Sequence, residues 1–94
     1  MKKDKIKINK INIENDIFSI VSNKNVIYTA PIIRGSVMFK IYNENNNEVD
    51  LSSIDENDII TMYSNNINSI IKIRIKNKYT FNSDSSEESF NIIF

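Results

Sequence analysis

Residues 69–81 read Ser-Ile-Ile-Lys-Ile-Arg-Ile-Lys-Asn-Lys-Tyr-Thr-Phe and carry the clearest strand pattern in the chain. Apolar and cationic side chains alternate along this stretch, which is the period of a β-strand with one buried and one exposed face. We expect the apolar side chains to face a core and the cations to face solvent. The apolar face comprises Ile71, Ile73, Ile75, Tyr79 and Phe81, and the cationic face comprises Lys72, Arg74, Lys76 and Lys78.

Similar alternation predicts further strands elsewhere, over residues 5–13, 16–22, 26–33, 36–43 and 59–63. In the first of these the isoleucines change parity after Ile8, so we expect a β-bulge near Asn9-Lys10 that restores one buried face. Polar turns rich in Asn separate the strands, and Asn tolerates the left-handed backbone conformation that tight turns need.

The predicted fold is all-β: a small antiparallel barrel or sandwich of about six strands, similar to an OB-fold. One Ala and one Leu stand beside 20 Ile, a composition that favours strands over helices. We favour a barrel because closure hides strand edges that would otherwise be exposed. The 94 residues fit one domain, which we assign to residues 1–81, followed by a tail over residues 82–94.

The tail begins with Asn-Ser-Asp-Ser-Ser-Glu-Glu-Ser, which has no apolar side chain to bury and is expected to be disordered. Residues 90–94, Phe-Asn-Ile-Ile-Phe, are apolar again. They are expected either to dock as a last strand on this chain or on a second copy, or to remain available to another protein. Ser85, with Glu88 three residues on, is the best-placed candidate for phosphorylation by an acid-directed kinase.

The chain contains no Cys and no His, which removes thiol nucleophiles, the commonest general base and the favoured ligands of transition metals. Asp55, Glu56 and Asp58 are close together, but their spacing matches no calcium loop, and we expect them to form a solvated turn. A single helical turn over residues 52–56, capped by Ser52 or Ser53, is an alternative there. We therefore predict a protein that is not an enzyme and has no metal or cofactor.

Positive and negative side chains are segregated along the chain. Residues 1–81 hold all 12 Lys and Arg but nine of the Asp and Glu, so their charge is 12 − 9 = +3. Lys3, Lys5 and Lys7 share one face of the first strand, as the four cations of residues 69–81 share one face of the last. If the two strands are close together, these seven cations form one band that binds phosphates by releasing counterions.

Aromatic rings beside such a band stack on unpaired bases, and Tyr42 and Tyr63 face outward in the predicted register. The alternative interpretation is that alternating Ile and Lys simply keeps the outer face of a half-buried strand in solution. We predict a module for single-stranded nucleic acid. Its candidate residues are Lys5, Lys7, Lys72, Arg74, Lys76, Lys78, Tyr42 and Tyr63.

Acidic residues followed by a terminal apolar cluster resemble the C-terminal tails of single-stranded-DNA-binding proteins from bacteria and some phages. That resemblance implies an OB-fold barrel with a tail that recruits a protein partner. The corresponding candidate residues here are Asp84, Glu87, Glu88, Phe90 and Phe94. The abundance of Ile, Asn and Lys also resembles the composition of viral proteins from AT-rich large DNA viruses.

A second class of function stays open: a structural or assembly protein, for example of a virion, that self-associates through strand edges and its C-terminal segment.

The basic N-terminal stretch, Met1 to Ile8, has no apolar run behind it, so we expect neither a secretory signal nor a membrane span. The expected location is intracellular, in the cytoplasm, the nucleus or the interior of a virion.

Overall fold

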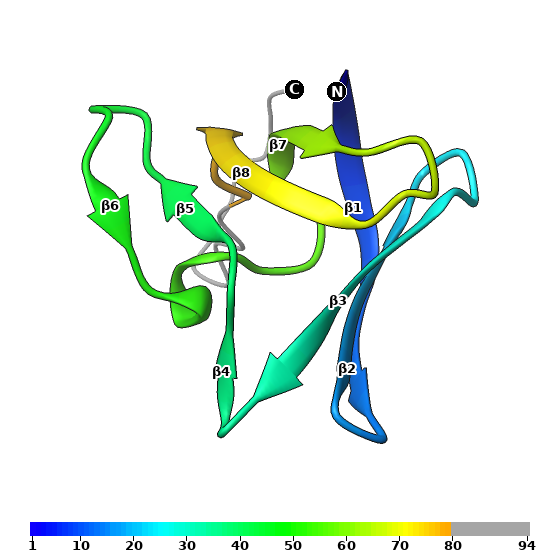
Figure 1. Ribbon diagram of the computed structural model, residues 1–94. Helices are drawn as coiled ribbons and strands as arrows, with labels where there is room; N and C mark the ends of the chain where they lie inside the picture. Colours follow the sequence, from blue (N-terminus) through cyan, green and yellow to red (C-terminus); the bar gives the residue numbers. More distant parts are fainter. Residues whose placement is uncertain (80–94) are drawn as a thin grey trace, which may run out of the picture.

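The computed structural model describes residues 1–79, which form one sheet of eight strands and one short 3-10 helix (Figure 1). The prediction of an all-β fold is confirmed. The predicted boundary between domain and tail, after residue 81, lies outside the described residues. The elements are β1 (Lys2–Glu14), β2 (Ile17–Ser22), β3 (Ile27–Ile33), β4 (Ser36–Val37), β5 (Lys40–Tyr42), β6 (Glu48–Val49), the 3-10 helix η1 (Leu51–Ser53), β7 (Ile59–Ser64) and β8 (Ile70–Asn77).

The strands lie in the order β4-β3-β2-β1-β7-β8-β5-β6, and every pair is antiparallel except β5 with β8. The long strand β1 joins the two halves of the sheet, since residues 2–7 pair with β7 and residues 8–14 pair with β2 (Figure 1). The ladder with β2 shifts register between Ile8 and Lys10. The predicted bulge at Asn9-Lys10 is therefore confirmed.

The sheet has eight strands rather than about six, and it is not closed. The predicted strand over residues 36–43 is interrupted at Met38 and Phe39, which leaves the two short strands β4 and β5. A further two-residue strand, β6, pairs with β5. The sheet curls until β3 approaches β8 at one isolated parallel bridge, Thr29 to Ser69, but its end strands β4 and β6 each pair on one side only within residues 1–79.

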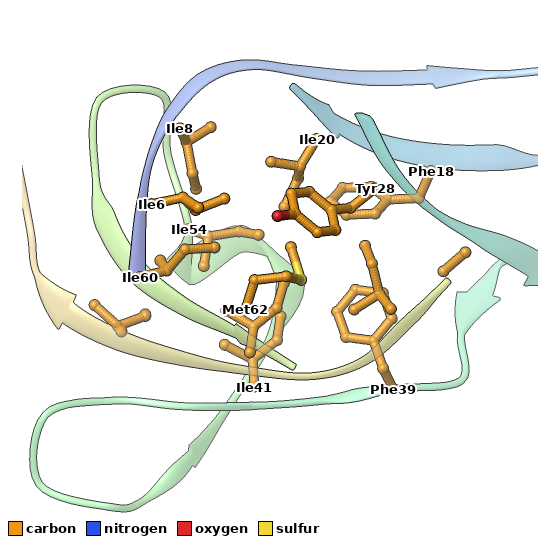
Figure 2. Packing of buried hydrophobic residues seen from close by; sticks show 14 residues of the cluster. Ile6, Ile8, Phe18, Ile20, Tyr28, Phe39, Ile41, Ile54, Ile60 and Met62 are labelled. Carbon is orange, nitrogen blue, oxygen red and sulfur yellow. The ribbon is translucent and has the colours of Figure 1, made fainter. Parts of the chain in front are cut away.

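The core lies inside this curl and is dominated by isoleucine, whose branched side chain suits a pleated surface. In Figure 2 the isoleucines of β1 and β7 gather at one side and the rings of Phe18, Tyr28 and Phe39 at the other, with Met62 between them. The rings of Phe18 and Phe39 are tilted at 42° with their centroids 5.6 Å apart. Tyr28 is buried and donates a hydrogen bond from its hydroxyl to Asp4 (3.3 Å).

The predicted inner face of β8 is correct at Ile73 and Ile75, which are buried, but wrong at both ends. The ladder between β7 and β8 shifts register beside Tyr63, so Ile70 takes the inner position and Ile71 is 45% exposed. At the other end β8 stops at Asn77, and Tyr79 is exposed. Phe81 lies outside the described residues.

Three hairpin loops share one construction. In each, the side-chain oxygen of the first residue accepts hydrogen bonds from backbone N–H groups two and four positions later, and the fourth residue adopts positive φ. The first residues are Ser22, Asn43 and Asn65, and the fourth residues are Asn25, Asn46 and Asn68. The high Asn content therefore has a structural use, because Asn both accepts these bonds and tolerates the left-handed conformation.

This construction predicts opposite outcomes for two substitutions at Asn68, whose φ is 61°. Asn68→Val is expected to lower the free energy of unfolding by about 1–2 kcal/mol, because a branched side chain is strained in the left-handed region. Asn68→Gly is expected to change it little, since Gly adopts this conformation freely. Urea unfolding of both variants checks the prediction, and equal losses would contradict it.

No helix within residues 1–79 is long and apolar enough to cross a lipid bilayer.

Candidate functional site

The outer face of β1, β7, β8 and β5 brings together cations from distant parts of the sequence. Residues that pair directly across neighbouring strands project from the same face of a sheet. The pairing therefore aligns two rows across this face. One row is Lys3, Tyr63, Lys72 and Lys40, and the next is Lys5, Thr61, Arg74 and Tyr42.

We call this surface the basic face and define it by six cations, Lys3, Lys5 and Lys7 of β1 with Lys72, Arg74 and Lys76 of β8. Lys76 is included from the alternation along β8, because the ladder with β7 shifts register there and pairs Asn77, not Lys76, with Ile59. The first and last strands are not neighbours, because β7 lies between them. They flank it on both sides, about 10 Å apart at the usual strand spacing. Two lines of long cationic side chains thus border a floor formed by the shorter Thr61 and by Tyr63.

The two predicted tyrosines lie on this face, each half-buried beneath cations. The Nζ atoms of Lys72 and Lys3 lie 4.4 and 5.8 Å from the centre of the Tyr63 ring. The guanidinium of Arg74 lies 5.5 Å from the centre of the Tyr42 ring. Cations at these distances are attracted to the π-face of the ring, which holds the long side chains over the floor.

The positive surroundings lower the pKa of Tyr63 below its usual value of 10.0. Partial burial acts in the opposite direction, but the hydrogen bond with Arg74 and the charges of Lys3 and Lys72 outweigh it. For Tyr28 the sign is reversed, because burial and the neighbouring Asp4 raise its pKa.

We expect these opposite shifts to be visible in an ultraviolet titration of the four tyrosines. Tyr63→Phe should remove the part of the absorbance rise that occurs at the lowest pH, because nearby cations stabilise the phenolate at this position and it ionises before the other tyrosines. Tyr28→Phe, the matched control, should remove change from the high-pH side. A Tyr63→Phe curve that keeps the low-pH side of the wild type would show that the cations do not surround this ring.

No carboxylate within residues 1–79 forms an ion pair with any of the six cations of the basic face. Lys40, at the margin, is paired with Glu48 at 3.6 Å, and both side chains are mostly exposed. Arg74 donates a hydrogen bond to the neutral side chain of Asn46. The repulsion among these side chains is thus not offset within the described chain, and an anion placed on the floor would relieve it.

Lys78, predicted to extend the row of cations on β8, is engaged elsewhere. Its Nζ donates to Asp58 Oδ2 (2.6 Å), Asp55 Oδ2 (2.9 Å) and the carbonyl oxygen of Ser53 (2.6 Å). Burial by itself lowers the pKa of Lys78, but the hydrogen bonds and charges of the two carboxylates raise it overall. Lys78 is therefore part of an ion-pair cluster and lies apart from the basic face.

The expectation of a solvated acidic turn at residues 55–58 is wrong for Asp58, which is fully buried. Its carboxylate accepts hydrogen bonds from the backbone N–H groups of Asp55 and Tyr79 as well as from Lys78. Glu56 accepts a bond from the N–H of Ile11. Within residues 1–79, no group of three or more His, Cys, Asp or Glu side chains is arranged so that it could hold a metal ion. The helical turn nearby is η1, which begins at Leu51 and has no side-chain cap.

The pattern of the sequence did not point to Lys40 or Thr61. Both reach the basic face through pairings between distant segments, β5 with β8 and β1 with β7, which no local period indicates. The predicted partner-binding residues of the tail lie outside the described residues. These are Asp84, Glu87, Glu88, Phe90 and Phe94.

Comparison with protein-family models, with curated proteins and with solved structures finds no match to this chain.

Proposed function

We propose that this protein is a non-enzymatic module that binds single-stranded nucleic acid on the basic face. The observation that carries the proposal is the arrangement of six cations along both sides of β7, none of them paired with a carboxylate within residues 1–79. Lysine and arginine lines of this kind follow a phosphate backbone and release its counterions. The role of the rings is to hold the cations and to contact bases, Tyr63 from the floor and Tyr42 from β5 beside Arg74.

The strand arrangement supports an OB-like version of the fold. The meander β1-β2-β3 is joined to the hairpin β7-β8 through the pair β1-β7, and the bridge from Thr29 to Ser69 brings β3 beside β8 in parallel. OB-folds are partly open barrels that bind oligonucleotides on their second and third strands. The basic face lies instead on β1, β7 and β8, so the proposed mode of binding is distinct.

A salt series with a fluorescent single-stranded oligonucleotide tests the proposal. Six phosphate contacts on a single strand give a slope of about −4 when the logarithm of the association constant is plotted against the logarithm of salt concentration. Binding that does not change with salt, or no binding at low salt, would refute it. A duplex of the same sequence provides the comparison, and we expect it to bind more weakly because its bases are not open to Tyr42 and Tyr63.

We further propose that the acidic tail recruits a protein partner, as in the proteins it resembles. The negative side chains of Asp84, Glu87 and Glu88 repel nucleic acid. Phe90 and Phe94 follow them in the sequence and are the proposed contacts with the partner. Capture of a partner by the full chain, lost in Phe90→Ser/Phe94→Ser, is the corresponding test.

An assembly role is the second candidate function. It is favoured by the open sheet, whose end strands β4 and β6 pair on one side only within the described residues. Such edges add strands from other chains. Light scattering of the full chain over a wide range of concentrations distinguishes the two roles, since an assembly protein forms oligomers and a strictly monomeric chain does not support this candidate.

A further inference from the structure

The two ends of the sheet face each other across a groove. Its volume is about 270 Å³, and it is lined on one side by β4 and its neighbours and on the other by β6 and the start of η1. In Figure 1, β6 lies at the left and β4 at the bottom of the molecule, with the short helical turn of η1 between them. The apolar lining consists of Phe39, which belongs to the core, and of Val37, Val49 and Leu51, which pack on the core from its margin.

Each strand that borders the groove has one unpaired edge within residues 1–79. β4 pairs only with β3, and β6 pairs only with β5. Unpaired edges next to apolar side chains are the usual acceptors of an added strand, which gains backbone hydrogen bonds and buries its alternate side chains. The groove is therefore suited to an extended apolar segment.

The end of the described chain is held to η1, the element whose first residue lines this groove. The side chain of Lys78 donates a hydrogen bond to the carbonyl oxygen of Ser53, at the end of η1, and Leu51 at the start of η1 lines the groove. The ten residues 80–89 span up to about 33 Å when extended, more than the 26 Å of the molecule's two shorter dimensions. Residues 80–89 are therefore long enough to let residues 90–94 reach the groove.

We propose that the groove between β4 and β6 binds residues 90–94 of the same chain as an added strand when no protein partner is bound to the tail. Phe90, Ile92 and Phe94 alternate and would place three apolar side chains on one face. No charged side chain occurs in this segment, so the added strand itself places no acidic side chain against Glu48 and Asp50, which also line the groove. A short tether also gives an effective concentration on the order of millimolar, which favours this occupant over a second copy.

A spin label placed at residue 89 tests the proposal directly, because the chain has no Cys and Ser89→Cys creates a single attachment site. In full-length protein labelled with nitrogen-15, we expect selective broadening of the amide signals of Val37 and Val49. The matched variant, Phe90→Ser/Phe94→Ser with the same label, should lose this broadening while its other amide signals remain unchanged. The absence of broadening in the first sample would overturn the proposal.

A mixed sample separates binding within the chain from binding between chains. Spin-labelled protein without nitrogen-15 is combined with unlabelled protein that carries nitrogen-15. The proposal predicts no broadening of β4 and β6 in this mixture, and broadening there would overturn it in favour of strand exchange between copies. Neither sample contains nucleic acid, so the outcome is independent of the function proposed for the basic face.

Discussion

Replacing Lys72, Arg74 and Lys76 together with Thr is expected to reduce oligonucleotide affinity about 100-fold at ~0.1 M salt. Each phosphate contact on a single strand contributes about 0.7 to the salt slope. Losing three contacts therefore removes about two logarithmic units from the rise in association constant between ~1 M and ~0.1 M salt. The slope itself should fall from about −4 to about −2. Threonine is chosen because its β-branched side chain favours strands and should leave β8 intact.

The matched control removes the same charge from other places. Lys10, Lys24 and Arg34 are exposed and belong to none of the rows that the pairing of β1, β7, β8 and β5 aligns. Because Arg34 has positive φ, the control is Lys10→Thr/Lys24→Ser/Arg34→Asn. We expect a change of less than threefold, because the removed charges do not border the floor of the basic face and therefore do not contact the phosphates that lie on it. Equal losses in the two variants would show that only net charge matters and that β1, β7 and β8 do not form a binding surface.

Local alternation in the sequence predicted most of the sheet because a strand's period is a property of a few consecutive residues. The parity change after Ile8 predicted the bulge at Asn9-Lys10 for the same reason: no buried face is continuous without it. The outward orientation of Tyr63 also follows from parity alone. These predictions needed no knowledge of which strands are neighbours.

Predictions failed where a distant residue decides the outcome. Ile71 belongs by parity to the inner face, but the shifted register beside Tyr63 gives that position to Ile70. Lys78 belongs by parity to the cationic face, but a buried carboxylate twenty positions earlier, Asp58, binds it. The interruption of the strand over residues 36–43, and the parallel pairing of β5 with β8, likewise depend on the packing of the whole chain.

Asp58→Ala is expected to lower the free energy of unfolding by about 3 kcal/mol, measured by urea denaturation at neutral pH. The substitution leaves the N–H groups of Asp55 and Tyr79 without their acceptor and leaves Lys78 without its closer carboxylate. The estimate is at the low end for a broken buried ion pair, because the Lys78 side chain is 33% exposed and can turn toward water.

The control for this prediction is Glu44→Ala, an exposed acid in a loop, for which we expect a change within about 0.5 kcal/mol. The pH dependence gives a second check on the cause. Because the pKa of Lys78 is raised in the folded protein, its ion pair contributes fully below the ordinary value of 10.5 and is lost as the pH rises through the raised pKa. The difference in stability between wild type and Asp58→Ala should therefore persist at neutral pH and shrink in strong alkali. A loss below about 1 kcal/mol at neutral pH would mean that Asp58 does not hold the end of β8.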